Sequence, residues 1–183
     1  MRCTLLADAA KTFESAAAGS PSAAASFLRA VRPVFAARVL AHVSPASTAA
    51  MLQARSPAES AVLIQQMSPR VAAAALEQLP SGVAGDICAE VPADFVARLV
   101  AMMSAQGAGA MVARLPARFA AEVMAVVESA THAAAVLAAM KPPDAALVLA
   151  ALAAAAPRAA VYILAASSAP QVRRCRLTLS HPR

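Results

Sequence analysis

Apolar residues recur along this chain with a period of twelve. The register runs through nine blocks, which start at residues 20, 32, 44, 56, 68, 80, 92, 104 and 116. We call the twelve positions of a block columns 1 to 12. Columns 8 and 9 are apolar in every block. Column 8 holds Phe27, Val39, Met51, Leu63, Ala75, Ile87, Leu99, Met111 and Val123. Column 9 holds Leu28, Leu40, Leu52, Ile64, Leu76, Cys88, Val100, Val112 and Met124.

Two further columns complete an apolar stripe. Column 5 is always a small residue or Val, and column 12 is apolar in every block except at Arg55. Columns 5, 8, 9 and 12 have the spacing i, i+3, i+4, i+7, which is one face of an α-helix. None of the fourteen charged residues between positions 20 and 127 falls in column 5, 8 or 9. Each block therefore predicts one short amphipathic helix.

Prolines mark the start of these helices. The first five stand at positions 21, 33, 45, 57 and 69, twelve residues apart. Ser44, Ser56 and Ser68 each precede one of them, and serine is a favoured N-cap where proline suits the first helical position. Ser56 with Glu59 forms the pattern of a capping box. We expect helices of about nine residues, roughly 14 Å long at 1.5 Å per residue.

Helices this short are unstable alone in water, so neighbouring helices must bury their apolar stripes. The sequence therefore predicts an all-α fold, a superhelical solenoid of short antiparallel helices with a 12-residue repeat. We expect an N-terminal capping helix over residues 1–19, the helical-repeat superhelix over 20–170 and a basic tail over 171–183. The register loosens after residue 128, as in terminal capping repeats.

Composition agrees with close-packed helices. Of the 183 residues, 60% are hydrophobic, but 55 of these are alanines and only 3% of the chain is aromatic. Such a composition suits helices and disfavours sheets. The longest uncharged apolar run, residues 145–156, is twelve residues long, and a membrane span needs about 18. We therefore expect no membrane span and, without a secretory leader pattern, a cytoplasmic location.

The positive charge is concentrated in the tail. The net charge is +6, but four arginines of the last eleven residues account for most of it, which leaves +2 for residues 1–172. Binding of nucleic acid through Arg173, Arg174 and Arg176 is therefore an alternative function, although four charges bind weakly at physiological salt. The nearly neutral body favours another protein as the partner.

No residue pattern points to catalysis, a cofactor or a metal. His42 and His132 are isolated and His181 lies in the tail, so no Ser/His/Asp or Cys/His arrangement can be placed. Cys3, Cys88 and Cys175 are too few and too scattered for a zinc site or a disulfide framework, and column 9 predicts burial for Cys88. We expect a protein that is not an enzyme; an enzyme whose active site leaves no sequence signal is the third and weakest alternative.

Gly107 and Gly109 fall within one block. No strand precedes them and no Lys-Ser/Thr follows, so they do not form a phosphate-binding loop. We interpret them as a softened or kinked helix.

The repeat resembles a known family. The pattern Leu, then Pro-Pro or Ser-Pro, then x-x-Ala-x-x-Leu-Leu-x-x-Leu is similar to the N-terminal superhelical domain of MgtE-type magnesium transporters, with related repeats in the flagellar motor switch protein FliG. It stands here as Met67-Ser68-Pro69-Arg70-Val71-Ala72 followed by Ala75-Leu76 and Leu79-Pro80, and recurs from Val91-Pro92 to Leu99-Val100 and from Leu115-Pro116 to Val123-Met124. The resemblance covers residues 20–170.

The resemblance implies a helical regulatory module rather than a transport activity. In the transporters this domain is acidic and precedes a nucleotide-fold regulatory pair and a membrane domain, neither of which follows here. The outward columns 3, 7, 10 and 11 instead mix the two signs of charge, with Arg70, Arg98, Arg114 and Arg118 beside Glu77, Asp86, Asp94 and Glu122. Magnesium prefers clustered oxygen ligands, so no magnesium site is carried over.

The sequence thus favours a non-catalytic protein-interaction, scaffold or regulatory module on an MgtE N-domain-like superhelix. The alternative is a nucleic-acid-binding helical-repeat protein. Met102 and Val126 are apolar residues at outward columns, and these two indicate a surface that contacts a partner.

Overall fold

The computed structural model describes residues 11, 14–15, 19–20, 26 and 31–167. Most of the predicted N-terminal helix over 1–19 and the whole tail over 171–183 lie outside this part of the chain. Within residues 31–167 the chain forms eleven α-helices and no strand, which confirms the predicted all-α fold.

The helices belong to two compact units, residues 1–91 and 92–183, and each unit is described by itself. The first unit contains α3 (Pro33–Leu40), α4 (Pro45–Gln53), α5 (Pro57–Gln65), α6 (Pro69–Glu77) and α7 (Ser81–Ala89). The second contains α8 (Ala93–Met102), α9 (Ala105–Val112), α10 (Ala117–Val126), α11 (Ala130–Ala139), α12 (Pro142–Ala155) and α13 (Pro157–Ala166).

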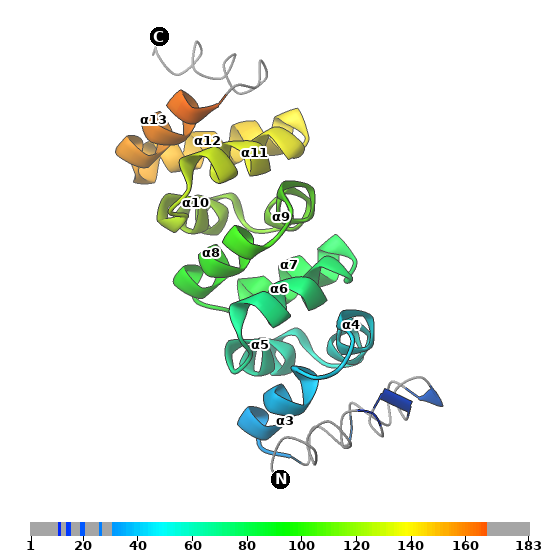
Figure 1. Ribbon diagram of the computed structural model, residues 1–183. Coiled ribbons are helices and arrows are strands. Elements are labelled where there is room, and N and C mark those ends of the chain that lie inside the picture. The colour runs from blue at the N-terminus through cyan, green and yellow to red at the C-terminus, as the bar shows by residue number, and fades with distance from the viewer. Residues whose placement is uncertain (1–10, 12–13, 16–18, 21–25, 27–30, 168–183) are drawn as a thin grey trace. The chain divides into compact units, whose positions relative to one another are not determined.

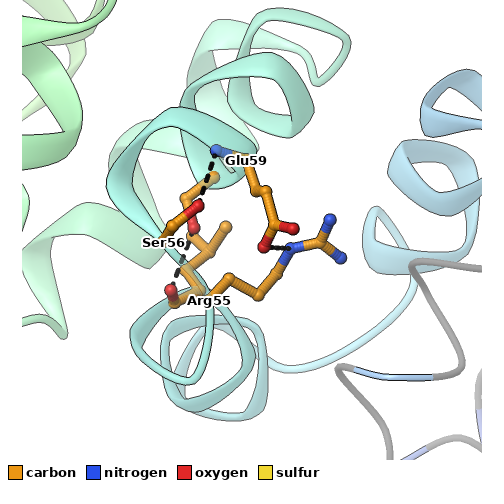
Figure 2. A network of polar contacts seen from close by, with 5 residues as sticks. Arg55, Ser56 and Glu59 are labelled. Carbon is orange, nitrogen blue, oxygen red and sulfur yellow. Dashed lines mark hydrogen bonds and ion pairs between the residues drawn. The ribbon is translucent and has the colours of Figure 1, made fainter.

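Serine and proline start several of these helices as the sequence predicts. Proline occupies the first turn of α3, α4, α5 and α6. The Ser44 hydroxyl accepts a hydrogen bond from the backbone N–H of Ser47 at 3.2 Å. Ser56 accepts one from the N–H of Glu59 at 3.3 Å (Figure 2), which is the Ser56 half of the predicted capping box. The prediction for Ser68 was wrong in part. Ser68 is the N-cap residue of α6, but its side chain accepts no capping bond, so the fixed φ of Pro69 starts this helix.

Within each unit, most helices pack mainly on a helix two places away along the chain. The first unit pairs α3 with α5, α4 with α6 and α5 with α7. The second unit pairs α8 with α10, α9 with α11, α10 with α12 and α11 with α13 (Figure 1). Odd-numbered and even-numbered helices therefore form two layers in each unit. This is the packing of a helical solenoid, as predicted.

The predicted apolar stripe forms the core. Columns 5, 8 and 9 are buried in every helix from α3 to α10, and column 12 is buried except at Val31 and Arg55, which are partly exposed. Column 6 is buried as well, and we did not predict this from the sequence. It holds only alanine and glycine: Ala37, Ala49, Ala61, Ala73, Gly85, Ala97, Gly109 and Ala121.

At Gly109 in column 6, the next helix of the same layer approaches closely. A Cβ atom added to Gly109 in α9 would lie 2.9 Å from the carbonyl oxygen of Val136 and 3.2 Å from Cβ of Ala139, both in α11. The α9 helix runs unbroken from Ala105 to Val112. Gly107 and Gly109 thus do not interrupt the helix, and Gly109 permits its close packing on α11.

The strict twelve-residue register loosens beyond residue 128, as expected, but the same columns stay buried. In α11 the buried positions are Ala133, Ala134, Val136, Leu137 and Met140, which are columns 5, 6, 8, 9 and 12 of a block starting at 129. Blocks starting at 141 and 156 bury columns 5, 8, 9 and 12 of α12 and α13 in the same way. One extra residue precedes the block that starts at Ser129. Three extra residues follow Leu152, where α12 is extended to 14 residues.

Candidate interaction surfaces

Charged side chains are exposed and mixed in sign. The outward residues of both signs singled out from the sequence are all exposed: Arg70, Arg98, Arg114, Arg118, Glu77, Asp86, Asp94 and Glu122. Residues 31–167 contain nine basic and eight acidic side chains, a net charge of +1. On α10, Arg118 pairs with Glu122 at 3.6 Å. This part of the chain therefore carries no excess charge to attract a polyanion.

Arg55 is the polar exception in column 12. Its side chain is 10% exposed, and its Nε lies 3.9 Å from Oε2 of Glu59 (Figure 2). The pair borders a hollow of about 190 Å³ between α3 and α5, whose other walls are formed by Val31, Pro33, Ala36, Val62 and Leu63. The hollow contains one ion pair in apolar surroundings and no nucleophile, so it offers no arrangement for acid–base or covalent chemistry.

His132 links two helices of the second unit. Its Nε2 lies 2.8 Å from the carbonyl oxygen of Val100 near the end of α8, and this oxygen also accepts from the N–H of Met103 at 3.3 Å. His42 is exposed, and His181 lies outside the described residues. The two described histidines lie in different units, so they do not belong to one catalytic arrangement.

Cys88 is fully buried in α7, as column 9 predicts. Burial raises the pKa of the Cys88 thiol to about 12, so the side chain is protonated at neutral pH and is no nucleophile. Cys3 and Cys175 lie outside the described residues. Within the described part of the chain, no group of three or more His, Cys, Asp or Glu could hold a metal ion.

Two apolar surfaces of the second unit are candidates. The first, which we call the column-11 surface, consists of Met102 on α8 and Val126 on α10. Their side chains are 60% and 46% exposed. Both occupy column 11, and α8 and α10 pack together in the same layer. The structure therefore exposes both residues that the sequence singled out, at equivalent positions of two adjacent helices.

The second surface, the end face, consists of Ala146 and Leu147 on α12 with Val161 and Tyr162 on α13. These are columns 6 and 7 of the two helices, and all four side chains are exposed. No described helix follows two places after α12 or α13, so column 6 is uncovered there. We did not identify this surface from the sequence. The available signal was Val161 in a column otherwise limited to alanine and glycine.

The model of the MgtE intracellular N domain family matches this chain over residues 6–94 and again over 43–135. The two overlapping matches together span more than half of the sequence, as a repeat that aligns in more than one register would. The chain belongs to the MgtE intracellular N domain family. This confirms the resemblance seen in the proline and apolar pattern. The match ends within α11, so α12, α13 and the end face lie beyond it.

No curated protein and no solved structure matches the chain significantly. Among the described residues, no helix combines the length and the apolar character needed to cross a bilayer. Membership of the MgtE N domain family therefore identifies a helical module, and its surfaces carry the remaining information on function.

Proposed function

We propose that this protein is a non-catalytic interaction module of the MgtE N domain type, which binds another protein inside the cell. The description of the family as an intracellular domain supports this location. The observation that supports an interaction role is the column-11 surface, where Met102 and Val126 expose apolar side chains at equivalent positions of two packed helices. Exposed apolar side chains that adjoin one another are typical of binding sites for other proteins.

Charge supports a protein partner over nucleic acid. The described body carries a net charge of only +1, so the basic residues that a polyanion would need are concentrated in the tail. A nucleic-acid-binding protein would lose affinity steeply as salt increases and would depend on Arg173, Arg174 and Arg176. The nucleic-acid function is excluded if the full chain retains no RNA or DNA at about 50 mM salt.

The interaction role is tested by comparing retained proteins between matched variants of the full chain. We expect Met102→Glu and Val126→Glu to lose a bound protein, because a charge at the centre of an apolar contact is costly to desolvate. Val62→Glu is the control, since Val62 is 50% exposed on α5 of the other unit. Pull-down with quantitative mass spectrometry measures the difference. Equal retention of every bound protein by all three variants and the unmodified chain would contradict the proposal.

A further inference from the structure

The outward faces of α8 and α10 are built on the same pattern of apolar residues. Column 4 holds Phe95 on α8 and Phe119 on α10, and both side chains are partly exposed. Column 11 holds Met102 and Val126, which form the column-11 surface and are 60% and 46% exposed. Columns 4, 7 and 11 have the spacing i, i+3, i+7, which places them on one face of a helix. Since α8 and α10 pack together in one layer, their outward faces adjoin.

The charges on these two faces have opposite signs at equivalent positions. In column 3, α8 carries Asp94 and α10 carries Arg118. In column 7, α8 carries Arg98 and α10 carries Glu122. All four side chains are exposed, and α8 and α10 are the two described helices that carry a charge in both columns. We call columns 3, 4, 7 and 11 of these two helices the α8–α10 face, and its charges sum to zero.

Contacts within each helix leave these charges accessible to a partner. On α8, the guanidinium carbon of Arg98 lies 5.0 Å from the ring centroid of Phe95. On α10, Arg118 and Glu122 pair at 3.6 Å, but their side chains remain 92% and 50% exposed. Charged and apolar groups therefore lie side by side along both helices. A partner that matches this face must oppose each charge with the other sign, because like charges brought together in a contact are destabilising.

We propose that the partner is a second copy of this chain, bound about a twofold axis that passes between α8 and α10. In a twofold contact the same patch faces itself, so α8 of each copy faces α10 of the other. With equivalent columns opposed, Asp94 of each copy meets Arg118 of the other. Arg98 of each copy likewise meets Glu122 of the other, and the apolar residues of columns 4 and 11 meet one another. The second copy therefore supplies every opposite charge that the face requires.

The same charges argue against the basic tail of the chain as the occupant of this face. Residues 171–183 contain four arginines and no acidic residue, so they would bring positive charge towards Arg98 and Arg118. A second copy brings both signs in equal number and in the matching order. Charge complementarity therefore favours the second copy.

Reversal of one charge of column 7 at a time tests this contact. Arg98→Glu and Glu122→Arg each give both helices the same sign in column 7, so two copies of one variant would oppose like charges. In a mixture of the two variants, each of these contacts again joins a carboxylate to a guanidinium group. The measurement is sedimentation equilibrium of the full chain from about 1 µM to about 1 mM.

We expect the unmodified chain to pass from monomer to dimer over this range. Each variant alone should dimerise at least about tenfold more weakly, and their equimolar mixture should regain most of this loss. Recovery on mixing cannot come from contacts within one chain, such as the pair of Arg118 with Glu122, because mixing does not alter them.

Arg38→Glu is the matched control, because Arg38 is exposed in column 7 of α3, which belongs to the first unit. This variant carries the same change of charge and should dimerise like the unmodified chain. Circular dichroism verifies that the three variants are equally helical, which is expected because Arg38, Arg98 and Glu122 are all exposed.

The inference rests on the proposed function, since it names the protein that the column-11 surface binds. A chain that stays monomeric throughout would overturn the inference. So would a dimer that neither charge reversal weakens, or a mixture that associates no better than the separate variants. A monomeric chain that retains a different protein, lost on Met102→Glu, would overturn the inference and leave the proposed function standing. A chain that neither dimerises nor retains any protein would contradict both.

Discussion

At the residue scale, the size of a side chain is fixed by how closely the next helix approaches. The alanine and glycine residues of column 6 are buried from α3 to α11, and they account for part of the alanine content of the chain. Column 9 imposes burial too, but it accepts larger side chains such as Leu40, Ile64 and Met124. Cys88 occupies this column, so packing among the neighbouring helices explains this residue better than a reaction of its thiol does.

The burial of Cys88 predicts a dependence of stability on alkaline pH. The folded protein keeps the Cys88 proton up to a pKa of about 12, whereas the ordinary value is 9.0. Above pH 9 the unfolded chain therefore binds fewer protons than the folded protein, and stability falls as the pH rises towards 12. The slope from this group is at most about 1.4 kcal/mol per pH unit, and below pH 9 the group contributes none.

Urea unfolding at a series of pH values measures this effect, and Cys88→Ala is the comparison. The variant is less stable at pH 7 because it loses buried volume, but its free energy of unfolding should decline less steeply above pH 9. Parallel declines in the two proteins would show that Cys88 does not keep its proton on folding.

At the element scale, the eleven short helices of residues 31–167 are held together by stacking within each unit, and most of them are only 8 to 10 residues long. Such helices do not persist alone, so each depends on the helices of its own unit that pack against it. Glycine has a different effect in different helices. In α9, Gly109 is buried against α11, whereas a Cβ atom at Gly82 in α7 would meet nothing within 4 Å.

The two glycines form a matched pair for testing the close approach of α9 and α11. We expect Gly109→Ala to destabilise the protein by about 1–3 kcal/mol, because the new methyl group meets the backbone oxygen of Val136 in a filled core. Gly82→Ala should be neutral or stabilising by up to about 1 kcal/mol, since alanine favours a helix more than glycine does. Chemical denaturation measures both. A Gly109→Ala variant as stable as Gly82→Ala would show that the two helices do not approach this closely.

At the scale of the whole molecule, the described repeat changes character at α12 and α13. Column 6 is buried as far as Ala134 in α11 and exposed at Ala146 and Val161. The described surface is otherwise nearly neutral, with positive and negative side chains interspersed. The pattern of burial seen in the earlier repeats therefore changes at the exposed apolar positions of α12 and α13.

Substitution of alanine by valine in column 6 tests whether α12 is covered by a further helix, as α10 is. Ala121 in α10 and Ala146 in α12 occupy the same column of the same layer. Ala121→Val adds two carbon atoms to a fully buried position and should cost about 1–3 kcal/mol. Ala146→Val adds them to an exposed position and should change stability by less than about 0.5 kcal/mol.

Both variants are measured by chemical denaturation at the same protein concentration. Both carry the same small cost of placing a β-branched residue in a helix, so their difference isolates the packing. An equally large loss of stability in Ala146→Val would mean that another segment covers α12.

The sequence by itself determined the fold and the elements within it. Period-twelve prolines and apolar columns predicted the helices, their starts and most of the core, because burial of one helix face imposes a 3.6-residue pattern that is visible without coordinates. Family membership was visible in the same residues. The charge arithmetic likewise indicated a neutral body, and Met102 and Val126 could be recognised as outward because their column was known.

Only the tertiary structure decided how close the helices lie and where their stacking changes. Alanine and glycine at Ala121 and Gly109 look the same in the sequence whether they are buried or exposed, because small side chains carry little polarity signal. The continuity of α9 at Gly109 and the missing cap bond of Ser68 depend on geometry between specific atoms. The end face is visible only when neighbouring helices are placed in space, because exposure depends on which surface a neighbour covers.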